Sequence, residues 1–272
     1  MKILPLDCPA EDLQPGDIIH LETPINPTGT TLSIEEYAKK AHSRGAFLIV
    51  DSTFAPPPLQ NPFQWGADIV MHSSTKYIGG HSDMLGGVLA VRHDYAGIPG
   101  NGVRIAEKLY SERLLLGGVM GSLEGWLGLR SIRTLSLRVN QASQSATKLV
   151  QWLTTSLPPH LAPLIKEVHH ASLEVTKASH KEWLPKQMPN GYGPVFAITM
   201  RSERLARYFP SKLHLFHHAT SLGGVESLIE WRALSDEHAD TSLLRVSVGI
   251  EGWEDLRDDI ERALGELLET GY

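Results

Sequence analysis

The chain has 272 residues, of which 42% are hydrophobic and 21% charged, and its formal net charge at pH 7 is -6. This composition is ordinary for a globular protein with a sizeable core, and it excludes a collagen, a coiled coil and a disordered chain. The mild acidity, without a run of five like charges, argues against nucleic-acid binding, because a phosphate-backbone binder needs a basic face.

The sequence contains a single cysteine, Cys8. A lone cysteine excludes an internal disulfide and a cysteine-based zinc site. The first apolar run is too short for a secretory signal, and no stretch approaches the roughly 18 apolar residues of a membrane span. We therefore expect a cytoplasmic protein without a membrane partner.

The first third of the chain alternates predicted strands with a helix and turns. Residues 17–23 predict a strand that Pro24 closes. Ser33 and Glu36 have the spacing of a capping box, which predicts a helix from there to about Arg44.

Three further strands are predicted at residues 46–50, 67–72 and 86–91. The run 46–50 is continuously apolar, which is typical of a strand buried on both faces of a parallel sheet. The alternation of strands and helix predicts an α/β fold with right-handed crossovers.

The middle of the chain is predicted to be helical from about residue 123 to residue 153, with an interruption near Asn140. Pro158 and Pro159 then mark a boundary. We predict two domains, at residues 1–154 and 155–272.

The second domain is predicted to be α+β. Residues 164–168 and 195–200 predict strands. Apolar residues recur at helical spacing from Trp253 to Leu267, which predicts an amphipathic helix at the end of the chain.

Polar residues follow the predicted strand ends in the first domain. Asn26, Asp51 and the segment 73–76 all lie at or just past such an end. Ligands of α/β sheets bind beyond the carboxyl ends of the strands, so these residues predict one site.

Lys76 follows two hydroxyl residues in the segment Ser73-Ser74-Thr75-Lys76. Hydroxyls and backbone N–H groups can hold a phosphate, and a lysine amine can bond to a carbonyl carbon. The segment is not a P-loop, because Thr75 rather than glycine precedes the lysine. The alternative for Lys76 alone is a surface lysine.

Asp51 ends the apolar strand 46–50, where a carboxylate is costly to bury unless it is paired. A helix cap or turn residue is one interpretation. A ribose-binding role is excluded, because no Gly-x-Gly-x-x-Gly segment precedes it after a strand. A carboxylate that faces a pyridinium nitrogen fits better.

Six separated segments form an ordered set that covers nearly the whole chain. They are residues 22–28, 50–55, 73–83 (Ser-Ser-Thr-Lys-Tyr-Ile-Gly-Gly-His-Ser-Asp), 126–138, 221–229 (Ser-Leu-Gly-Gly-Val-Glu-Ser-Leu-Ile) and 244–251. In this order they resemble the trans-sulfuration enzymes of Cys/Met metabolism. This family depends on pyridoxal 5'-phosphate (PLP) and includes cystathionine γ-synthase, the cystathionine lyases and methionine γ-lyase.

The resemblance implies the fold type I of PLP-dependent transferases: a partial, mostly parallel large-domain sheet and a smaller C-terminal α+β domain. Lys76 would bind PLP covalently and then move protons between substrate carbons. Asp51 would pair with the ring nitrogen, and the hydroxyls of Ser73 and Thr75 would bind the phosphate.

The resemblance also implies where the ring and the substrate lie. Asn26 would lie near the ring hydroxyl and Thr53 near the ring. Arg245 would bind the substrate α-carboxylate with a bidentate fork, with Ser221 beside it. Lys76 would need a lowered pKa to act as nucleophile and base.

The likeness begins late in the family pattern. Family members have a longer N-terminus, and its segments that bind the phosphate and stack on the ring have no counterpart before Asp17. We therefore expect a partial sheet with an open strand edge and an uncovered apolar face. A truncated sequence, a split protein and a non-catalytic remnant all fit this pattern, and the intact motifs favour the first.

Two departures concern the substrate. Thr220 occupies a position that differs among the family's activities, and residues 230–241 lack the usual Met-Thr-His. Synthase, β-lyase and γ-lyase therefore stay open.

The remaining candidates are weaker. The histidine pairs at 169–170 and 217–218 do not predict a metal site, because neighbouring residues of a strand point to opposite faces. His72 and His81 flank the lysine segment and either line the site or serve the structure. We predict no metal.

The sequence thus predicts a PLP-dependent enzyme that carries out β- or γ-elimination or γ-replacement on a small sulfur amino acid. One alternative is a non-catalytic or partner-dependent subunit, and another is a PLP aminotransferase of the same fold. The resemblance implies a homo-oligomer, either a dimer or a tetramer, or a pairing with a full-length partner chain.

Overall fold

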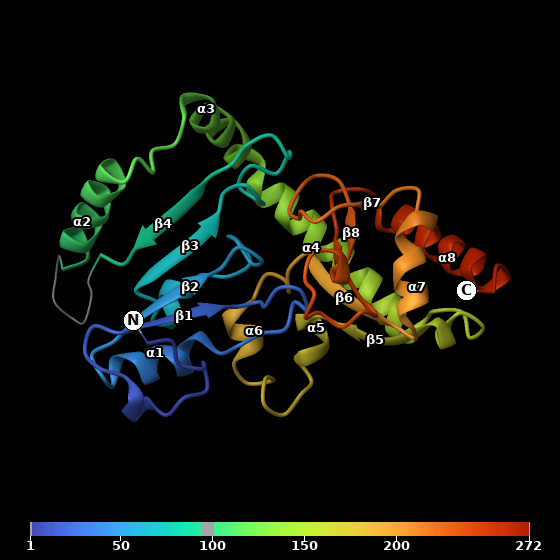
Figure 1. Ribbon diagram of the computed structural model, residues 1–272, viewed down its shortest axis with the longest axis horizontal. Coiled ribbons are helices and arrows are strands. Elements are labelled where there is room, and N and C mark those ends of the chain that lie inside the picture. Colours follow the sequence, from blue (N-terminus) through green and yellow to red (C-terminus); the bar gives the residue numbers. More distant parts are fainter. Residues whose placement is uncertain (1, 94–100, 272) are drawn as a thin grey trace.

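Two β-sheets, one in each half of the chain, organise the computed structural model, which describes residues 2–93 and 101–271 (Figure 1). The N-terminal sheet has four strands and the C-terminal sheet has five. Helices pack on the outer faces of both, and the long helix α4 (Leu135–Thr155) connects the two halves.

The N-terminal sheet has the strand order β1-β2-β3-β4. Its strands are β1 (Ile18–Glu22), β2 (Phe47–Asp51), β3 (Ile69–Ser73) and β4 (Gly87–Val91). The first three are parallel, and β4 is antiparallel to β3 because it returns through a loop rather than through a crossover helix. The predicted mostly parallel α/β sheet is confirmed.

Helix α1 (Ile34–His42) connects β1 to β2 and begins as predicted. The Ser33 hydroxyl accepts a hydrogen bond from the backbone N–H of Glu36. The helix ends at His42, two residues before the predicted end, and Gly45 makes the turn into β2 with φ +68°. Its apolar face is buried against the sheet.

The middle helices are α2 (Asn101–Leu115), α3 (Ser122–Ser131) and α4, with a 3₁₀ turn at Ile132–Thr134 between the last two. The interruption expected near Asn140 is wrong, because α4 continues through that residue. The chain breaks instead at Ile132–Thr134, where Arg138 folds back and donates hydrogen bonds to Ser131 and Thr134.

The C-terminal sheet is mixed, with the order β5-β6-β9-β8-β7. Only β7 and β8 are parallel. The strands are β5 (Ile165–His169), β6 (Val195–Met200), β7 (His217–His218), β8 (Leu228–Trp231) and β9 (Leu243–Ser247). Two of them, β5 and β6, were predicted; the others are short or lie inside motif segments.

The other helices are short, except for the last. They are α5 (Ala171–Glu174), α6 (Leu184–Gln187), α7 (Glu203–Tyr208), α8 (Trp253–Glu269) and 3₁₀ turns at Ala10–Asp12, Pro62–Trp65, Ala162–Leu164, Phe209–Lys212 and Arg232–Leu234. Helix α8 is the predicted terminal amphipathic helix.

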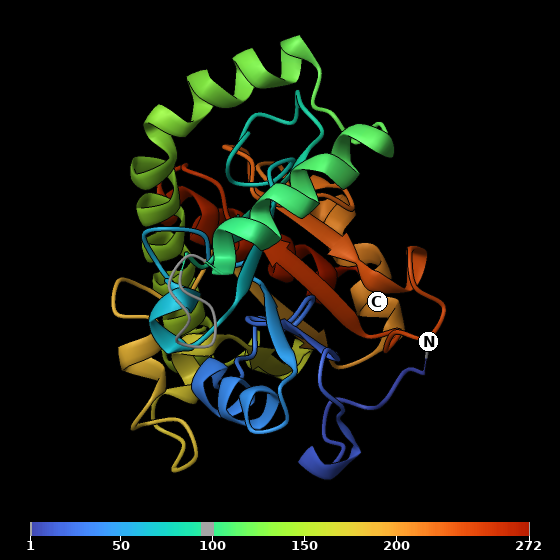
Figure 2. The same ribbon diagram turned by 90° about the vertical axis from the view of Figure 1, so that its left-hand side faces the viewer.

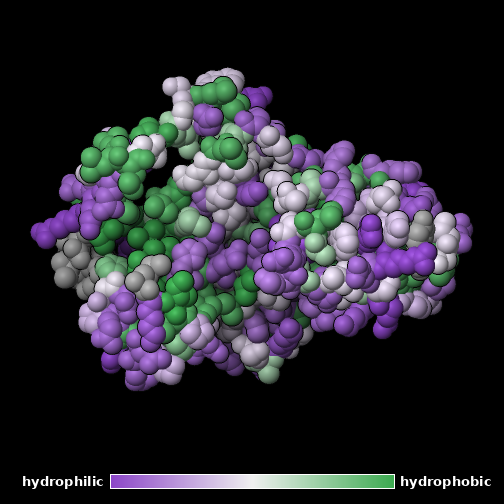
Figure 3. All heavy atoms as spheres, viewed as in Figure 1, coloured by the Kyte–Doolittle hydropathy of each residue, from purple (hydrophilic) through white to green (hydrophobic). Residues whose placement is uncertain are grey.

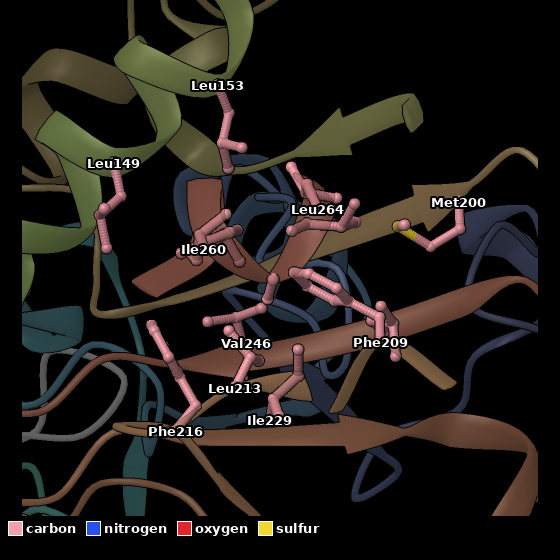
Figure 4. Packing of buried hydrophobic residues seen from close by; sticks show 14 of the residues in the cluster. Leu149, Leu153, Met200, Phe209, Leu213, Phe216, Ile229, Val246, Ile260 and Leu264 are labelled. Carbon is pink, nitrogen blue, oxygen red and sulfur yellow. The ribbon is translucent and has the colours of Figure 1, made fainter. Parts of the chain in front are cut away.

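The largest core lies between the C-terminal sheet and the helices α4 and α8. Leu149 and Leu153 of α4 and Ile260 and Leu264 of α8 point toward the sheet residues Val246 and Ile229 in Figure 4. The second half of α4 therefore packs with the C-terminal sheet. A second cluster of buried hydrophobic residues lies between the N-terminal sheet and helix α1. A third cluster contains residues of both halves of the chain.

A large share of the exposed apolar side chains lies between residues 85 and 137. They include Leu85, Val88, Leu89, Tyr110, Leu114, Leu115, Leu116, Leu123, Trp126, Leu129 and Leu137. Figure 2 shows α2 crossing in front of the N-terminal sheet, and Figure 3 shows apolar surface gathered over α2 and the adjoining part of that sheet. The uncovered apolar face that the sequence predicted is present on β4, α2, α3 and the start of α4.

Among the helices of the described residues, none is long and apolar enough to cross a membrane.

The packing of α4 can be tested by replacing two of its leucines, one buried and one exposed. Leu149 is fully buried in the C-terminal core, whereas Leu137 is 73% exposed. We expect Leu149→Ala to lower the free energy of unfolding by about 3 kcal/mol, because it leaves a cavity. Leu137→Ala should stay within about 0.5 kcal/mol of the wild type in the same urea titration. Equal losses in both variants would contradict this packing.

Candidate functional site

The predicted site residues of the N-terminal half meet at one edge of the sheet. Asp51 is the last residue of β2, Ser73 is the last residue of β3, and Asn26 follows β1 by four residues. Because these strands are parallel, their carboxyl ends lie side by side. The three residues therefore lie at, or just past, the same edge of the sheet.

A short chain of hydrogen bonds connects Asp51 with the lysine segment. The Thr53 backbone N–H donates to Oδ1 of Asp51 at 2.9 Å. The Thr53 hydroxyl in turn accepts from the backbone N–H of Ser73 at 2.9 Å. Thr53 therefore fixes the distance between the carboxylate and the turn that carries Lys76.

Lys76 lies in a tight turn directly after β3. Its backbone N–H donates to the Ser73 carbonyl at 3.1 Å, and its carbonyl accepts from Gly80 N–H at 2.7 Å. The Thr75 hydroxyl accepts from Gly86 N–H at 3.0 Å, which ties the turn to the start of β4. The Lys76 amine points to the C-terminal half, where Nζ lies 3.2 Å from Oγ of Ser221.

The environment of Lys76 lowers the pKa of its amine. Burial is the main cause, the positive charge of Arg245 adds to it, and the negative charge of Glu230 opposes it. The amine thus loses its proton more readily than an ordinary lysine, as nucleophilic or basic chemistry requires.

Arg245 lies on β9 and connects the two halves of the chain. Its Nη1 donates to Oδ1 of Asn26 at 3.2 Å, and its Nη2 donates to the carbonyls of Thr220 and of Ser221, the latter at 3.0 Å. Nη2 also lies 2.6 Å from Oε2 of Glu230. Of the predicted site residues, Asn26, Ser221, Lys76 and Arg245 therefore form one connected group.

Gly223 lets the two halves approach each other closely. Its φ is +80°, and a Cβ at this position would lie 2.9 Å from the backbone nitrogen of Tyr77 and 3.1 Å from Cβ of Lys76. A side chain there would clash with the backbone that carries the lysine. The Ser-Leu-Gly-Gly motif thus has a steric reason at its first glycine.

Arg138 also holds the lysine turn, although the sequence assigned it no role of its own. Its Nη1 donates to the Tyr77 carbonyl at 2.8 Å, and its Nη2 donates to Ser131 at 3.0 Å. It is the last residue of the motif segment 126–138. The position of this arginine in that segment was the signal that could have found it.

The two histidines near the lysine differ. The pKa of His72 is lowered, mainly by burial, and its Nδ1 is buried without a hydrogen-bond partner in the described part of the chain. Nδ1 of His81 lies 2.8 Å from the Gly79 carbonyl, so it serves the turn after the lysine. No group of metal-ligating side chains occurs among the described residues, including those at 169–170 and 217–218.

The model of the Cys/Met metabolism PLP-dependent enzyme family matches residues 10–265. The chain belongs to this family. Its curated relatives include a cystathionine beta-lyase of Lactococcus lactis, 35% identical over 258 residues, and a cystathionine gamma-lyase of Bacillus subtilis, 36% identical over 261 residues. These alignments cover 90% and 92% of this chain but 63% and 64% of the relatives.

Solved structures show the same fold. The crystal structure of metB from Corynebacterium glutamicum is similar with a TM-score of 0.81 and 32% identity, over 92% of this chain and 63% of that one. A cystathionine gamma-lyase from Lactobacillus plantarum complexed with L-serine is similar with a TM-score of 0.81 and 29% identity, over 93% and 64%. The fold class predicted from the sequence is confirmed. The relatives include beta-lyases, gamma-lyases and a gamma-synthase, and they do not favour the aminotransferase alternative.

The residues present fit PLP, the cofactor of this family. An amine with a lowered pKa, from Lys76, suits an aldehyde carbon. Asp51 lies directly opposite Glu22 in the register of β1 and β2, and burial followed by Asp51 raises the pKa of Glu22. This concentration of negative charge suits a protonated ring nitrogen. The hydroxyls of Ser73 and Thr75 flank the lysine turn and suit a phosphate.

The role of Gly223 can be tested against a second glycine. Gly223→Ala should lower the free energy of unfolding by about 1–3 kcal/mol, because it combines a positive φ with a close contact. Gly125 lies in α3, and a Cβ there would have nothing within 4 Å. Gly125→Ala should raise stability by up to about 1 kcal/mol, as expected for glycine in a helix. A stable Gly223→Ala chain in the same denaturation series would contradict the close contact.

The lowered pKa of Lys76 gives a pH dependence that needs no cofactor. Labelling with acetic anhydride, followed by mass spectrometry, reports the fraction of free amine at each pH. We expect the midpoint for Lys76 to lie below that of an ordinary lysine. Arg245→Met removes a positive charge, which should raise the pKa of Lys76 and move the midpoint to higher pH. The exposed Lys166 is the internal reference, and an unchanged or lower midpoint in Arg245→Met would oppose the proposed coupling.

Proposed function

We propose that this chain carries the PLP-binding and substrate-binding groups of an enzyme that performs β- or γ-elimination or γ-replacement on a small sulfur amino acid. The observation that carries the proposal is the connected arrangement of Lys76, Ser221, Arg245 and Asn26, together with the hydrogen bonds of Thr53 that connect Asp51 to Ser73 at the start of the lysine segment. The matched relatives, named as lyases and synthases of cystathionine, support the reaction class. The chain spans about 63% of their length, so the activity of the whole protein is part of the proposal.

Six residues would hold the cofactor. Lys76 would bind it covalently, Asp51 would pair with the ring nitrogen, and Asn26 would lie near the ring hydroxyl. Thr53 would lie near the ring, and the hydroxyls of Ser73 and Thr75 would bind the phosphate. Within residues 2–93 and 101–271, the Thr75 hydroxyl donates only in a long contact of 3.4 Å to the Gly86 carbonyl, so its proton is available for a phosphate oxygen.

When bound, PLP supplies an electron sink for negative charge at the substrate α-carbon. The charge of Asp51 would keep the ring nitrogen protonated. The unprotonated Nζ of Lys76 would take the proton from the α-carbon. As the bond between carbon and sulfur breaks in an elimination, the same amine would give a proton to the departing sulfur. Its hydrogen bond to the Ser221 hydroxyl directs this amine toward the face of the site formed by the C-terminal half.

Arg245 would bind the α-carboxylate of the substrate, with Ser221 beside it. A guanidinium fork held by Asn26 and two backbone carbonyls is already oriented before a ligand arrives. A similar structure was solved with L-serine, an amino acid, which supports an amino acid as ligand. The departures from the family pattern at Thr220 and residues 230–241 leave open which sulfur amino acid would react.

The division into domains at residues 1–154 and 155–272 is also a proposal. The two separate sheets support it, and the packing of α4 with both halves makes this helix the connection. The exposed apolar surface between residues 85 and 137 supports an assembly, either a homo-oligomer or a pair with a longer chain of the family. We also propose a cytoplasmic location for the protein.

The first test is a visible absorbance scan of the chain with added PLP. The wild type should show the band of lysine-bound PLP, and borohydride should fix the cofactor to the peptide that contains Lys76. Lys76→Ala should lose the band completely, because it removes the amine that would bind the cofactor.

Lys166→Ala is the matched control, since Lys166 is exposed on β5 in the other sheet. It should keep the band and the labelled peptide. Reduction that fixes PLP to several surface lysines, with no loss in Lys76→Ala, would show that the chain does not assemble the proposed site.

A further inference from the structure

Arg245 already has a carboxylate partner inside the protein, Glu230. Nη2 of Arg245 lies 2.6 Å from Oε2 of Glu230, and the two side chains are 3% and 2% exposed. The two residues are directly opposite each other in the register of β8 and β9, so their side chains share one face of the sheet. The sheet itself therefore places a negative charge beside the arginine that would bind a substrate carboxylate.

Glu230 is held on its other side as well. Nη1 of Arg232 lies 3.1 and 3.2 Å from its two carboxylate oxygens, and the Ser235 hydroxyl donates to Oε1. Arg232 follows two residues after Glu230 at the strand end. Two guanidinium groups therefore flank one carboxylate and hold Glu230 in place.

The orientation of Arg245 does not depend on Glu230 alone. Asn26 and the carbonyls of Thr220 and Ser221 accept three further hydrogen bonds from the same guanidinium. An uncharged side chain at position 230 would leave these contacts intact. What Glu230 alone contributes among these partners is its negative charge.

We propose that Glu230 is a resident counter-ion that weakens the binding of a substrate carboxylate at Arg245. The inference rests on the proposed function, in which Arg245 binds the α-carboxylate. Two carboxylates on one guanidinium repel each other, and the repulsion is strong where little water is present to screen it. Glu230 thus holds down the affinity for every ligand with an α-carboxylate, and this favours release of a product that keeps that group.

The test separates charge from the rest of the ligand. L-Norleucine carries the α-carboxylate and has no leaving group, whereas norleucinamide has the same chain without the negative charge. Both are titrated into the wild type and into Glu230→Gln in the presence of PLP, and the visible absorbance is followed. The ligand-induced rise in the unfolding temperature is a second readout that does not depend on the absorbance.

We expect Glu230→Gln to bind norleucine about tenfold more tightly than the wild type, the order of magnitude for removing one nearby like charge. The affinity for norleucinamide should not change. Glu230→Asp keeps the charge and should restore the wild-type preference. Glu230→Ala removes the charge with a smaller side chain and carries the same expectation as Glu230→Gln, should the latter fail to fold.

Asp236→Asn is the matched control. Asp236 forms an ion pair with Arg232 at 3.6 Å, and its side chain is 44% exposed. Removing this charge should leave the norleucine affinity within about twofold of the wild type, because exposed ion pairs contribute little. Control and test thus differ in whether the lost carboxylate contacts Arg245.

Two results would overturn the inference. One is an equal norleucine affinity in the wild type and in folded Glu230→Gln, and the other is a tighter binding of norleucinamide by the same factor. A third result would count against the proposed function and remove this inference with it. In that case the wild type binds norleucine and norleucinamide equally, and Arg245→Met has the same norleucine affinity as the wild type.

Discussion

The site depends on one buried guanidinium that crosses between the two halves of the chain. Arg245 starts on β9 of the C-terminal sheet and reaches Asn26 beyond β1 of the N-terminal sheet. Charged side chains are buried only where their hydrogen-bonding capacity is met. Arg245 meets this condition with acceptors from both halves, so its burial requires that the two sheets are docked as observed.

The docking has an apolar part and a steric part. Phe54, Leu59 and Tyr77 of the N-terminal half share a buried cluster with Val195 and Leu222 of the C-terminal half. Gly223 then brings the C-terminal loop onto the backbone next to Lys76. Hydrophobic burial holds the halves together without directional preference, whereas the missing side chain at Gly223 and the contacts of Arg245 select one relative position. The distance between the Lys76 amine and the Ser221 hydroxyl follows from that position.

Much of this arrangement could be predicted from the sequence, because it follows from patterns within short segments of the chain. The strands β1, β2 and β3 were all predicted, β2 as a continuous apolar run. Asp51 lies at the end of β2 and Lys76 lies just past β3, on the side where ligands of parallel sheets bind. The contacts of Arg138 and Glu230 could not be predicted this way. Both depend on which residues meet across a turn or a strand pair, and β8 and β9 were not predicted as strands. The break before α4 was placed wrongly because Asn140 is a weak helix former that the surrounding packing tolerates.

The charges of the site form two groups of opposite character. Asp51 and Glu22 concentrate negative charge at the ends of β2 and β1, whereas Arg245 and Arg232 surround Glu230 on the facing sheet. Charges of the second group, on Arg245 and Glu230, act on the pKa of the Lys76 amine in opposite directions. A ligand that carries a positive ring nitrogen at one end and a carboxylate at the other matches this separation, since each end meets the charge that it needs. In the proposed function, this polarity would set the direction in which such a ligand binds.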